Sequence, residues 1–108
     1  MPRFILTVVG NAVAGREDEA NEWYDTIHLQ EVLALPGFVS AQRFEPTEPE
    51  EGKPVRYLAH YEIEADDPSG PMAALGQAVQ TTMNMSDAMD ASSFVTNVYK
   101  ARTEKFEK

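Results

Sequence analysis

One amphipathic segment limits the possible folds of this chain more than any other feature. Residues 21–38 repeat apolar side chains at helical spacing and close on Pro36-Gly37, a pair that ends a helix. Carboxylates at positions 17–19 stand where the first turn would be, and negative charge there suits the helix dipole. We therefore predict a helix over residues 17–35, followed at once by a different kind of element.

Short runs rich in β-branched and aromatic residues flank that helix and a second one. We predict strands over residues 4–9, 39–45, 55–64 and 94–101, and a second helix from Asp67-Pro68 to about Thr81. The order β-α-β-β-α-β is typical of a ferredoxin-like α+β domain, with both helices on one face of a four-stranded antiparallel sheet. We expect residues 1–108 to form one such domain.

The segments between these elements are less regular. Glu45 to Lys53 is rich in proline and charge, which predicts a solvated loop that contributes little to stability. Residues 83–91 are rich in methionine and ambiguous, and one short helical turn is the favoured interpretation. We expect residues 102–108 to form a charged, mobile tail.

The predicted strands carry apolar side chains on both faces. In the first strand Phe4, Leu6 and Val8 alternate with Ile5 and Val9. One layer of helices covers only one face of a sheet, so the other face needs a partner. We expect a homodimer in which two sheets pack face to face, the arrangement called a dimeric α+β barrel.

Composition excludes several classes of function. A formal net charge of -9 repels nucleic acids and anionic membrane surfaces, so neither is an expected partner. The chain has no cysteine and no long apolar run, which favours a cytoplasmic protein. The two histidines lie far apart and no metal-ligand spacing or glycine-rich phosphate loop is present, so we expect neither a metal nor a cofactor.

The first helix carries the residues that suggest a function. Projected at about 100° per residue, it turns a broad stripe toward the sheet. Glu31 lies inside this stripe, and His28 lies at its edge, three residues from both Asp25 and Glu31. A carboxylate among apolar side chains is costly unless it is paired or hydrated, so we predict a polar pocket here. We expect His28 to transfer protons, with Asp25 as its orienter and Glu31 as a second acid or base. The predicted stripe consists of Ala20, Trp23, Tyr24, Ile27, Ala34 and Leu35.

Purely structural roles compete with this hypothesis. His28 could be a hydrogen-bonded residue at the helix edge, and the aromatic pair before it could serve core packing alone. Glu31 could form an ion pair with Arg43 or Arg56. His60 alternates with the apolar face of its strand, which places it at the dimer interface or, if the faces are inverted, in the pocket.

The string Asn-Glu-Trp-Tyr-Asp-Thr-Ile-His at residues 21–28, with Pro-Gly-Phe and a strand ending in Arg43-Phe44, resembles the EthD-like family of dimeric α+β barrel proteins. The resemblance covers about a quarter of the chain strongly, and the element order agrees elsewhere. It maps the family's histidine onto His28, its aspartate onto Asp25 and its aromatic residue onto Trp23. Many members have proline where this chain has Gln30, and residues 83–91 match poorly.

The resemblance implies a small cofactor-independent enzyme that acts on an aromatic or polyketide-like compound, as an isomerase, cyclase, lyase or monooxygenase-like enzyme. We expect Trp23, Tyr24 and Tyr61 to form the walls of the substrate pocket, with His60 as a further contact. Arg43 could steady an enolate or a carboxylate. The alternatives are a non-catalytic ligand-binding or accessory protein, a structural dimer and, more distantly, haem ligation by His28, since larger barrel relatives bind haem.

Overall fold

Four antiparallel strands form one sheet in the computed structural model, which describes residues 2–108. The strands are β1 (Arg3–Gly10), β2 (Phe38–Phe44), β3 (Tyr57–Glu64) and β4 (Val95–Lys100). They lie side by side in the order β2-β3-β1-β4. This order, with one helical crossover after β1 and another after β3, confirms the ferredoxin-like α+β fold.

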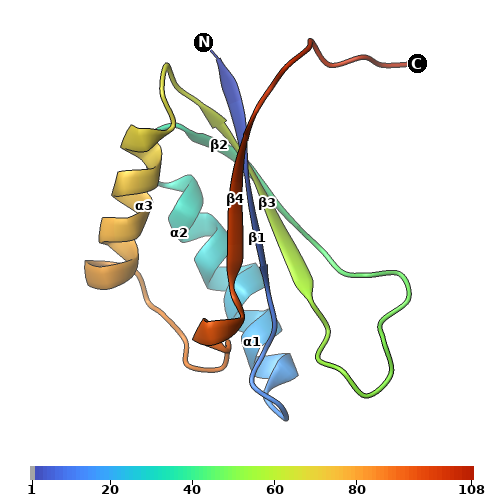
Figure 1. Cartoon of the computed structure of the whole chain (residues 1–108). Coiled ribbons are helices and arrows are strands. Elements are labelled where there is room, and N and C mark those ends of the chain that lie inside the picture. The colour runs from blue at the N-terminus through green and yellow to red at the C-terminus, as the bar shows by residue number, and fades with distance from the viewer. Residues whose placement is uncertain (1) are drawn as a thin grey trace.

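The helices cover one face of this sheet (Figure 1). The first crossover is a continuous helical segment made of α1 (Glu17–Trp23), a π-helical turn η1 (Tyr24–His28) and α2 (Leu29–Leu33). It stops before Pro36-Gly37, as predicted, and Gly37 has φ of 91°, a backbone angle that suits glycine. The second crossover holds α3 (Ser69–Thr81), where the Asp67 carboxylate accepts a hydrogen bond of 2.7 Å from the Ser69 N–H.

The hydrophobic core lies between the sheet and the first helical segment. Leu6 of β1 and Tyr61 and Ile63 of β3 are its largest fully buried side chains, together with Val32 of α2. Only Pro71 and Ala78 are buried among the residues of α3. Met72 and Leu75 are partly buried and also pack against the core, so α3 buries less of its surface than the first helical segment.

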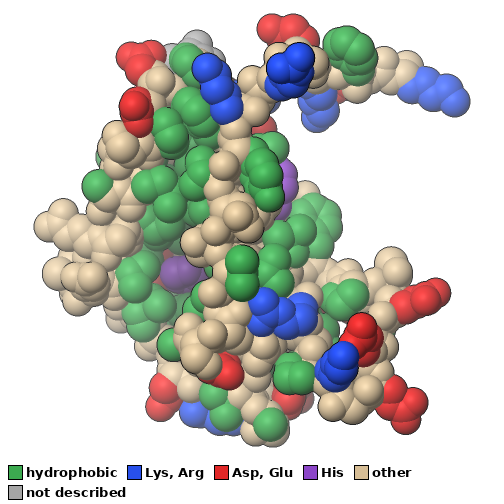
Figure 2. Space-filling view, viewed as in Figure 1, with side chains coloured by type: hydrophobic (Ala, Val, Ile, Leu, Met, Phe, Trp, Pro, Cys, Tyr) green, Lys and Arg blue, Asp and Glu red, His purple; other side chains and the backbone are tan. Residues whose placement is uncertain are grey.

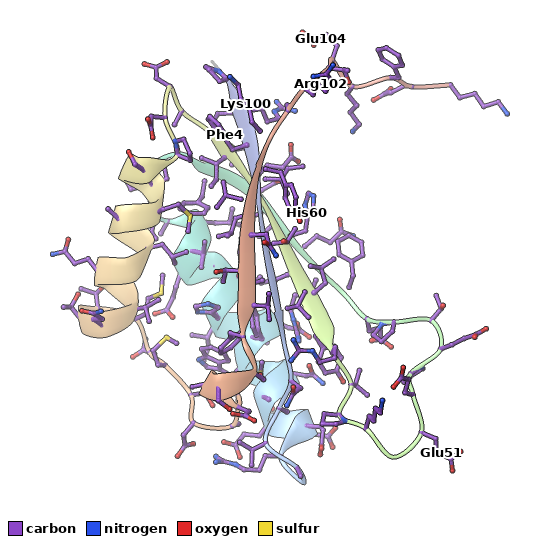
Figure 3. The ribbon with its side chains drawn as sticks, viewed as in Figure 1. Phe4, Glu51, His60, Lys100, Arg102 and Glu104 are labelled. Carbon is purple, nitrogen blue, oxygen red and sulfur yellow. The ribbon has the colours of Figure 1, made fainter. Side chains whose placement is uncertain are left out.

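The opposite face of the sheet has no described element over it, and its side chains alternate with those of the core. Figure 3 labels His60 on this face, away from the helices. His60 is flanked in register by Thr7 of β1 and Gln42 of β2, near the middle of the sheet. The face also carries the apolar side chains of Ile5, Val9, Phe44, Leu58, Val95 and Tyr99.

The methionine-rich segment differs from its predicted structure. Residues 82–90 contain no helical turn; they form a loop in which Ala88 and Met89 are buried and Met89 bridges to Ala12. The short turn follows later, as the 3-10 helix η2 (Ala91–Ser93). The expected helical turn was wrong because this loop is ordered by contacts with distant residues rather than by its own sequence.

Within residues 2–108, the helices are all too short or too polar to cross a membrane. The charged residues 101–108 run away from the sheet as an exposed extended segment, and residues 45–56 project from the other end as a loop (Figure 1).

Candidate functional site

A π-helical turn decides which side chains of the first helical segment reach the core. In η1 the Leu29 N–H bonds to the carbonyl of Tyr24, five residues back instead of four. Such a turn holds one extra residue. After it, each place on the helix surface is taken by the residue one position later in the sequence than an α-helix would put there. π-Helical turns of this kind are frequent at functional sites.

This shift corrects the predicted stripe. Ile27 was expected to face the sheet, but it is 40% exposed, and His28 takes its place with an exposure of 8%. In the next turn Val32 is buried in the place predicted for Glu31. The prediction of His28 as an edge residue was therefore wrong, since its imidazole belongs to the interior.

Aromatic rings enclose His28. Its imidazole stacks on the indole of Trp23, with centroids 4.7 Å apart and an interplanar angle of 21°. The ring of Tyr24 meets it edge-on at 4.9 Å and 89°. The Nδ1 atom of His28 is buried and has no hydrogen-bond partner among the described residues. A buried polar atom without a partner costs about 1–3 kcal/mol, so its persistence calls for an explanation.

Burial is the main influence on the protonation of His28. It lowers the pKa of the imidazole from its ordinary value, and the nearby positive charge of Arg43 lowers it further, while Glu31 opposes the change. The imidazole is therefore neutral at neutral pH, and a neutral imidazole can accept a proton.

Glu31 has a structural partner that the sequence did not reveal. Its Oε2 accepts hydrogen bonds from the backbone N–H and the side-chain amide of Asn84, at 3.0 and 3.2 Å. The Trp23 indole N–H donates to the Asn84 carbonyl at 2.6 Å. These contacts fix the loop of residues 82–90 beside the helix. The alternative of an ion pair between Glu31 and Arg43 or Arg56 is not formed. The Oε1 atom of Glu31 stays buried and has no partner among residues 2–108.

Asp25 does not orient His28 in this structure. Its carboxylate is 56% exposed and accepts a hydrogen bond of 2.7 Å from Nη1 of Arg43. Both residues lie within the π turn, where each residue rotates the chain by less than in an α-helix, so side chains three residues apart no longer point the same way. The expected Asp25–His28 pair is thus replaced by an Asp25–Arg43 pair.

The guanidinium of Arg43 lies between two tyrosine rings. Its central carbon is 4.3 Å from the ring centroid of Tyr24 and 4.9 Å from that of Tyr57. The side chain is only 10% exposed, and its Nε and Nη2 atoms are buried without hydrogen-bond partners in the described part of the chain. Tyr24 therefore separates Arg43 from His28, and each of these two side chains holds unsatisfied polar atoms.

Two phenols complete the interior. The hydroxyl groups of Tyr24 and Tyr61 are 3.4 Å apart. Burial raises the pKa of both, so both remain protonated at neutral pH and can act as hydrogen-bond donors rather than as bases. Tyr61 thus lies beside Tyr24 in the buried core.

An open groove of about 510 Å³ lies at the outer edge between the first helical segment and β2. Neither His28 nor Glu31 lines it. The predicted cavity shared by those two residues is therefore not this groove, which instead gathers the Asp25–Arg43 pair. The sequence predicted only Asp25 and Arg43 of this lining, because spacing along the chain does not show which residues of separate elements meet. The groove is lined by Asn21, Asp25, Leu29, Ala41, Gln42, Arg43, Phe44, Glu45 and Tyr57.

The predicted substrate contact His60 lies apart from this cluster. It is on the open face of the sheet, and its ring meets Phe44 edge-on at a centroid distance of 6.2 Å. Tyr61, its neighbour in β3, points to the opposite, helical face. Hydrophobic side chains gather on both sides of β4 in Figure 2, in keeping with a sheet that is apolar on both faces. Over residues 2–108, no three side chains of His, Asp or Glu are grouped as metal ligands.

Comparison with known proteins supports the fold. Neither a family model nor a curated protein matches the sequence. Among solved structures, a dimeric ferredoxin-like protein from an uncultured marine organism aligns with a TM-score of 0.62 and 13% identity, over 97% of this chain and 100% of the other. A candidate antibiotic-biosynthesis monooxygenase from Bacillus cereus aligns with a TM-score of 0.58 and 13% identity, over 99% and 100%.

A third similar structure carries a ligand. A point mutant of MhuD, with two manganese protoporphyrin IX molecules bound per active site, aligns with a TM-score of 0.61 and 11% identity, over 96% of this chain and 99% of that one. At such low identities these similarities establish the fold alone.

Proposed function

We propose that this protein is a small enzyme that transfers a proton on a small aromatic or polyketide-like carbonyl compound without a cofactor. The observation that carries the proposal is His28: a buried, neutral imidazole with an unpartnered Nδ1 atom, enclosed by Trp23 and Tyr24. A base of this kind accepts a proton most easily from a substrate that brings its own apolar surface into the aromatic enclosure.

The neighbouring groups suit an enolate-like intermediate. The protonated hydroxyls of Tyr24 and Tyr61 could donate hydrogen bonds to the oxygen on which negative charge develops. Glu31 keeps one unpartnered oxygen, which could take part as the second acid or base. Similar structures described as candidate monooxygenases are compatible with an enzyme of small organic compounds.

A non-catalytic ligand-binding or accessory protein is the second candidate. It is favoured by the position of Asp25, which bonds to Arg43 and leaves His28 without the carboxylate that orients many catalytic histidines. A binder would use the same aromatic enclosure without proton transfer.

We further propose membership of the EthD-like family and assembly as a cytoplasmic homodimer. The Trp-Tyr-Asp and Pro-Gly-Phe motifs support the family. The open face of the sheet supports the dimer, because Val95 and Tyr99 on it are 51% and 55% exposed in a single chain. Apolar side chains in such a patch usually mark an interface. A similar structure is described as dimeric.

Carbon-acid exchange tests the catalytic role directly, whichever reaction follows the proton transfer. The protein is incubated in D2O with a panel of small phenolic ketones and 1,3-dicarbonyl compounds, and NMR follows loss of the proton next to the carbonyl. We expect exchange above background for at least one compound, and loss of that exchange in His28→Gln while the compound still binds.

His60→Gln is the matched control, because it makes the same substitution on the opposite face of the sheet. Its exchange rate should equal that of the wild type. Binding without any exchange in the wild type would identify a binder, and exchange at the wild-type rate in His28→Gln would remove His28 from the mechanism.

A further inference from the structure

The groove beside β2 has a buried cation at its inner wall. Arg43 uses Nη1 for Asp25, but its Nε and Nη2 atoms have no acceptor among residues 2–108. Nε–H and one N–H of Nη2 lie parallel along the same edge of a planar guanidinium, and this edge matches the two oxygens of a carboxylate. The unused donors therefore have the geometry for an organic acid. Because both atoms are buried in this structure, such an acid reaches them only by displacing part of the groove wall.

The orientation of Arg43 is fixed before any ligand arrives. The guanidinium carbon lies within 5 Å of the ring centroids of both Tyr24 (4.3 Å) and Tyr57 (4.9 Å), and Asp25 accepts a hydrogen bond from Nη1. Within the described residues, only the Nε/Nη2 edge is left without a partner. A side chain fixed in this way loses little conformational entropy on binding, which favours recognition even by a small anion.

The rest of the groove suits the body of such an acid. Leu29, Ala41 and the ring of Tyr57 supply apolar surface, while Asn21 supplies an amide. A volume of about 510 Å³ is large enough for a single-ring compound. Glu45 and Asp25 at the groove disfavour ligands with several negative charges, so a monocarboxylate fits best.

We propose that this groove is a binding site for a small, largely apolar monocarboxylate, held bidentate by the Nε and Nη2 atoms of Arg43. Neither His28 nor Glu31 lines the groove. The site therefore stands independently of proton transfer by His28, and each proposal can fail without the other.

Benzoate is the probe, with the neutral, isosteric benzamide as its control. The protein is labelled with ¹⁵N and titrated with each compound, and the Arg43 Nε–H resonance is followed by NMR. We expect benzoate to shift this resonance with saturation and benzamide to bind about tenfold or more weakly, because it lacks the charge-assisted bidentate pair.

Variants of equal charge separate the site from general attraction of anions. Arg43→Gln should weaken benzoate binding about tenfold or more, whereas Arg56→Gln, which removes an arginine bonded to Asn11 and Ser93, should leave it unchanged. His28→Gln should also leave it unchanged, whatever that variant does to proton exchange. Arg43→Lys keeps the charge without the fork and should bind benzoate with intermediate affinity, which provides a second test if Arg43→Gln fails to fold.

Three results would overturn the proposal. The first is equal binding of benzoate and benzamide by the wild type. The second is an Arg43 Nε–H resonance that does not move during titration, which would mean that the fork is occupied by another group or is inaccessible. The third is an equal loss of affinity in the Arg43→Gln and Arg56→Gln variants.

Discussion

A methyl group added at Gly37 should destabilise the domain more than the same change at any other glycine with a similar backbone angle. Gly37 joins the first helical segment to β2 at φ of 91°, and a Cβ built there would lie 2.7 Å from Cγ of Pro71 in α3. Because a proline ring cannot rotate away and Pro71 is buried, α3 itself would have to move.

The expected size follows from two separate costs. The left-handed backbone angle destabilises an alanine by about 1–2 kcal/mol. Alanine also lowers the conformational entropy of the unfolded chain relative to glycine, which stabilises the folded state by about 0.4–1 kcal/mol. Overpacking against Pro71 adds about 1–3 kcal/mol. Gly37→Ala should therefore lose roughly 2–4 kcal/mol, which for a domain of this size is a fall in Tm of roughly 8–16 °C.

Two other glycines supply matched controls. Gly15 has φ of 85° but nothing within 4 Å of an added Cβ, so Gly15→Ala isolates the backbone cost and should lose about 1 kcal/mol. Gly76 lies within α3 with open space around it, and Gly76→Ala should stabilise the domain by about 0.5–1 kcal/mol.

Chemical denaturation followed by circular dichroism measures all three changes, at several protein concentrations because assembly alters apparent stability. The reasoning is refuted if Gly37→Ala and Gly15→Ala lose the same free energy within about 0.5 kcal/mol. That result would mean that α3 yields to the new methyl group without cost and that Pro71 does not hold it in place.

Three further predictions concern pH, the long loop and assembly. In the unfolded chain His28 takes up a proton near its ordinary pKa, whereas burial lowers the pKa of the folded group. Wild-type stability should therefore fall relative to His28→Gln as pH drops below about 6.5. Equal pH profiles of the two proteins in denaturation experiments would show that the imidazole is not desolvated. Shortening the exposed loop between Glu45 and Lys53 should change the free energy of unfolding by less than about 1 kcal/mol, and a larger fall in denaturation experiments would show that the loop packs on the domain. Light scattering should find a dimer for the wild type and a monomer for Tyr99→Glu, because that variant puts a charge on the open sheet face. A wild-type monomer near 12.0 kDa would refute the interface.

The fold was predictable because its signals are local and repeated. The alternation in β3 is enough to separate Tyr61 from His60, and the structure places them on opposite faces as predicted. Pro36-Gly37 ends the first helical segment, and Asp67-Pro68 precedes the second. The order of elements then leaves few topologies, and the ferredoxin-like sheet is one of them.

The loop of residues 82–90 was not predictable for the opposite reason. Its position depends on Asn84, which bonds to Glu31 and to the indole of Trp23. Another bond joins Arg16 to Asp87 at 2.8 Å. These partners are distant in the sequence, and no periodicity within the loop indicates them.

The candidate site was misplaced by a single assumption about helical geometry. Projection at about 100° per residue is valid only while each turn holds the α-helical number of residues. The π turn at Tyr24–His28 adds one residue, which exchanges Ile27 for His28 and Glu31 for Val32 on the buried stripe. The sequence did contain a signal of this extra residue. An α-helical projection puts the Glu31 carboxylate in the middle of the apolar stripe, and a shift of one residue puts Val32 there instead.

That same shift makes the site possible. An unbroken α-helix would bury the isoleucine and leave the imidazole at the edge, with its pKa close to the ordinary value. The extra residue instead inserts His28 between two aromatic rings, while Asp25 stays outside and pairs with Arg43. A domain built only for stability would gain from isoleucine at this position, since a buried imidazole with an unpartnered nitrogen costs free energy. The unpartnered Nδ1 atom is therefore the observation on which the proposed role of His28 rests.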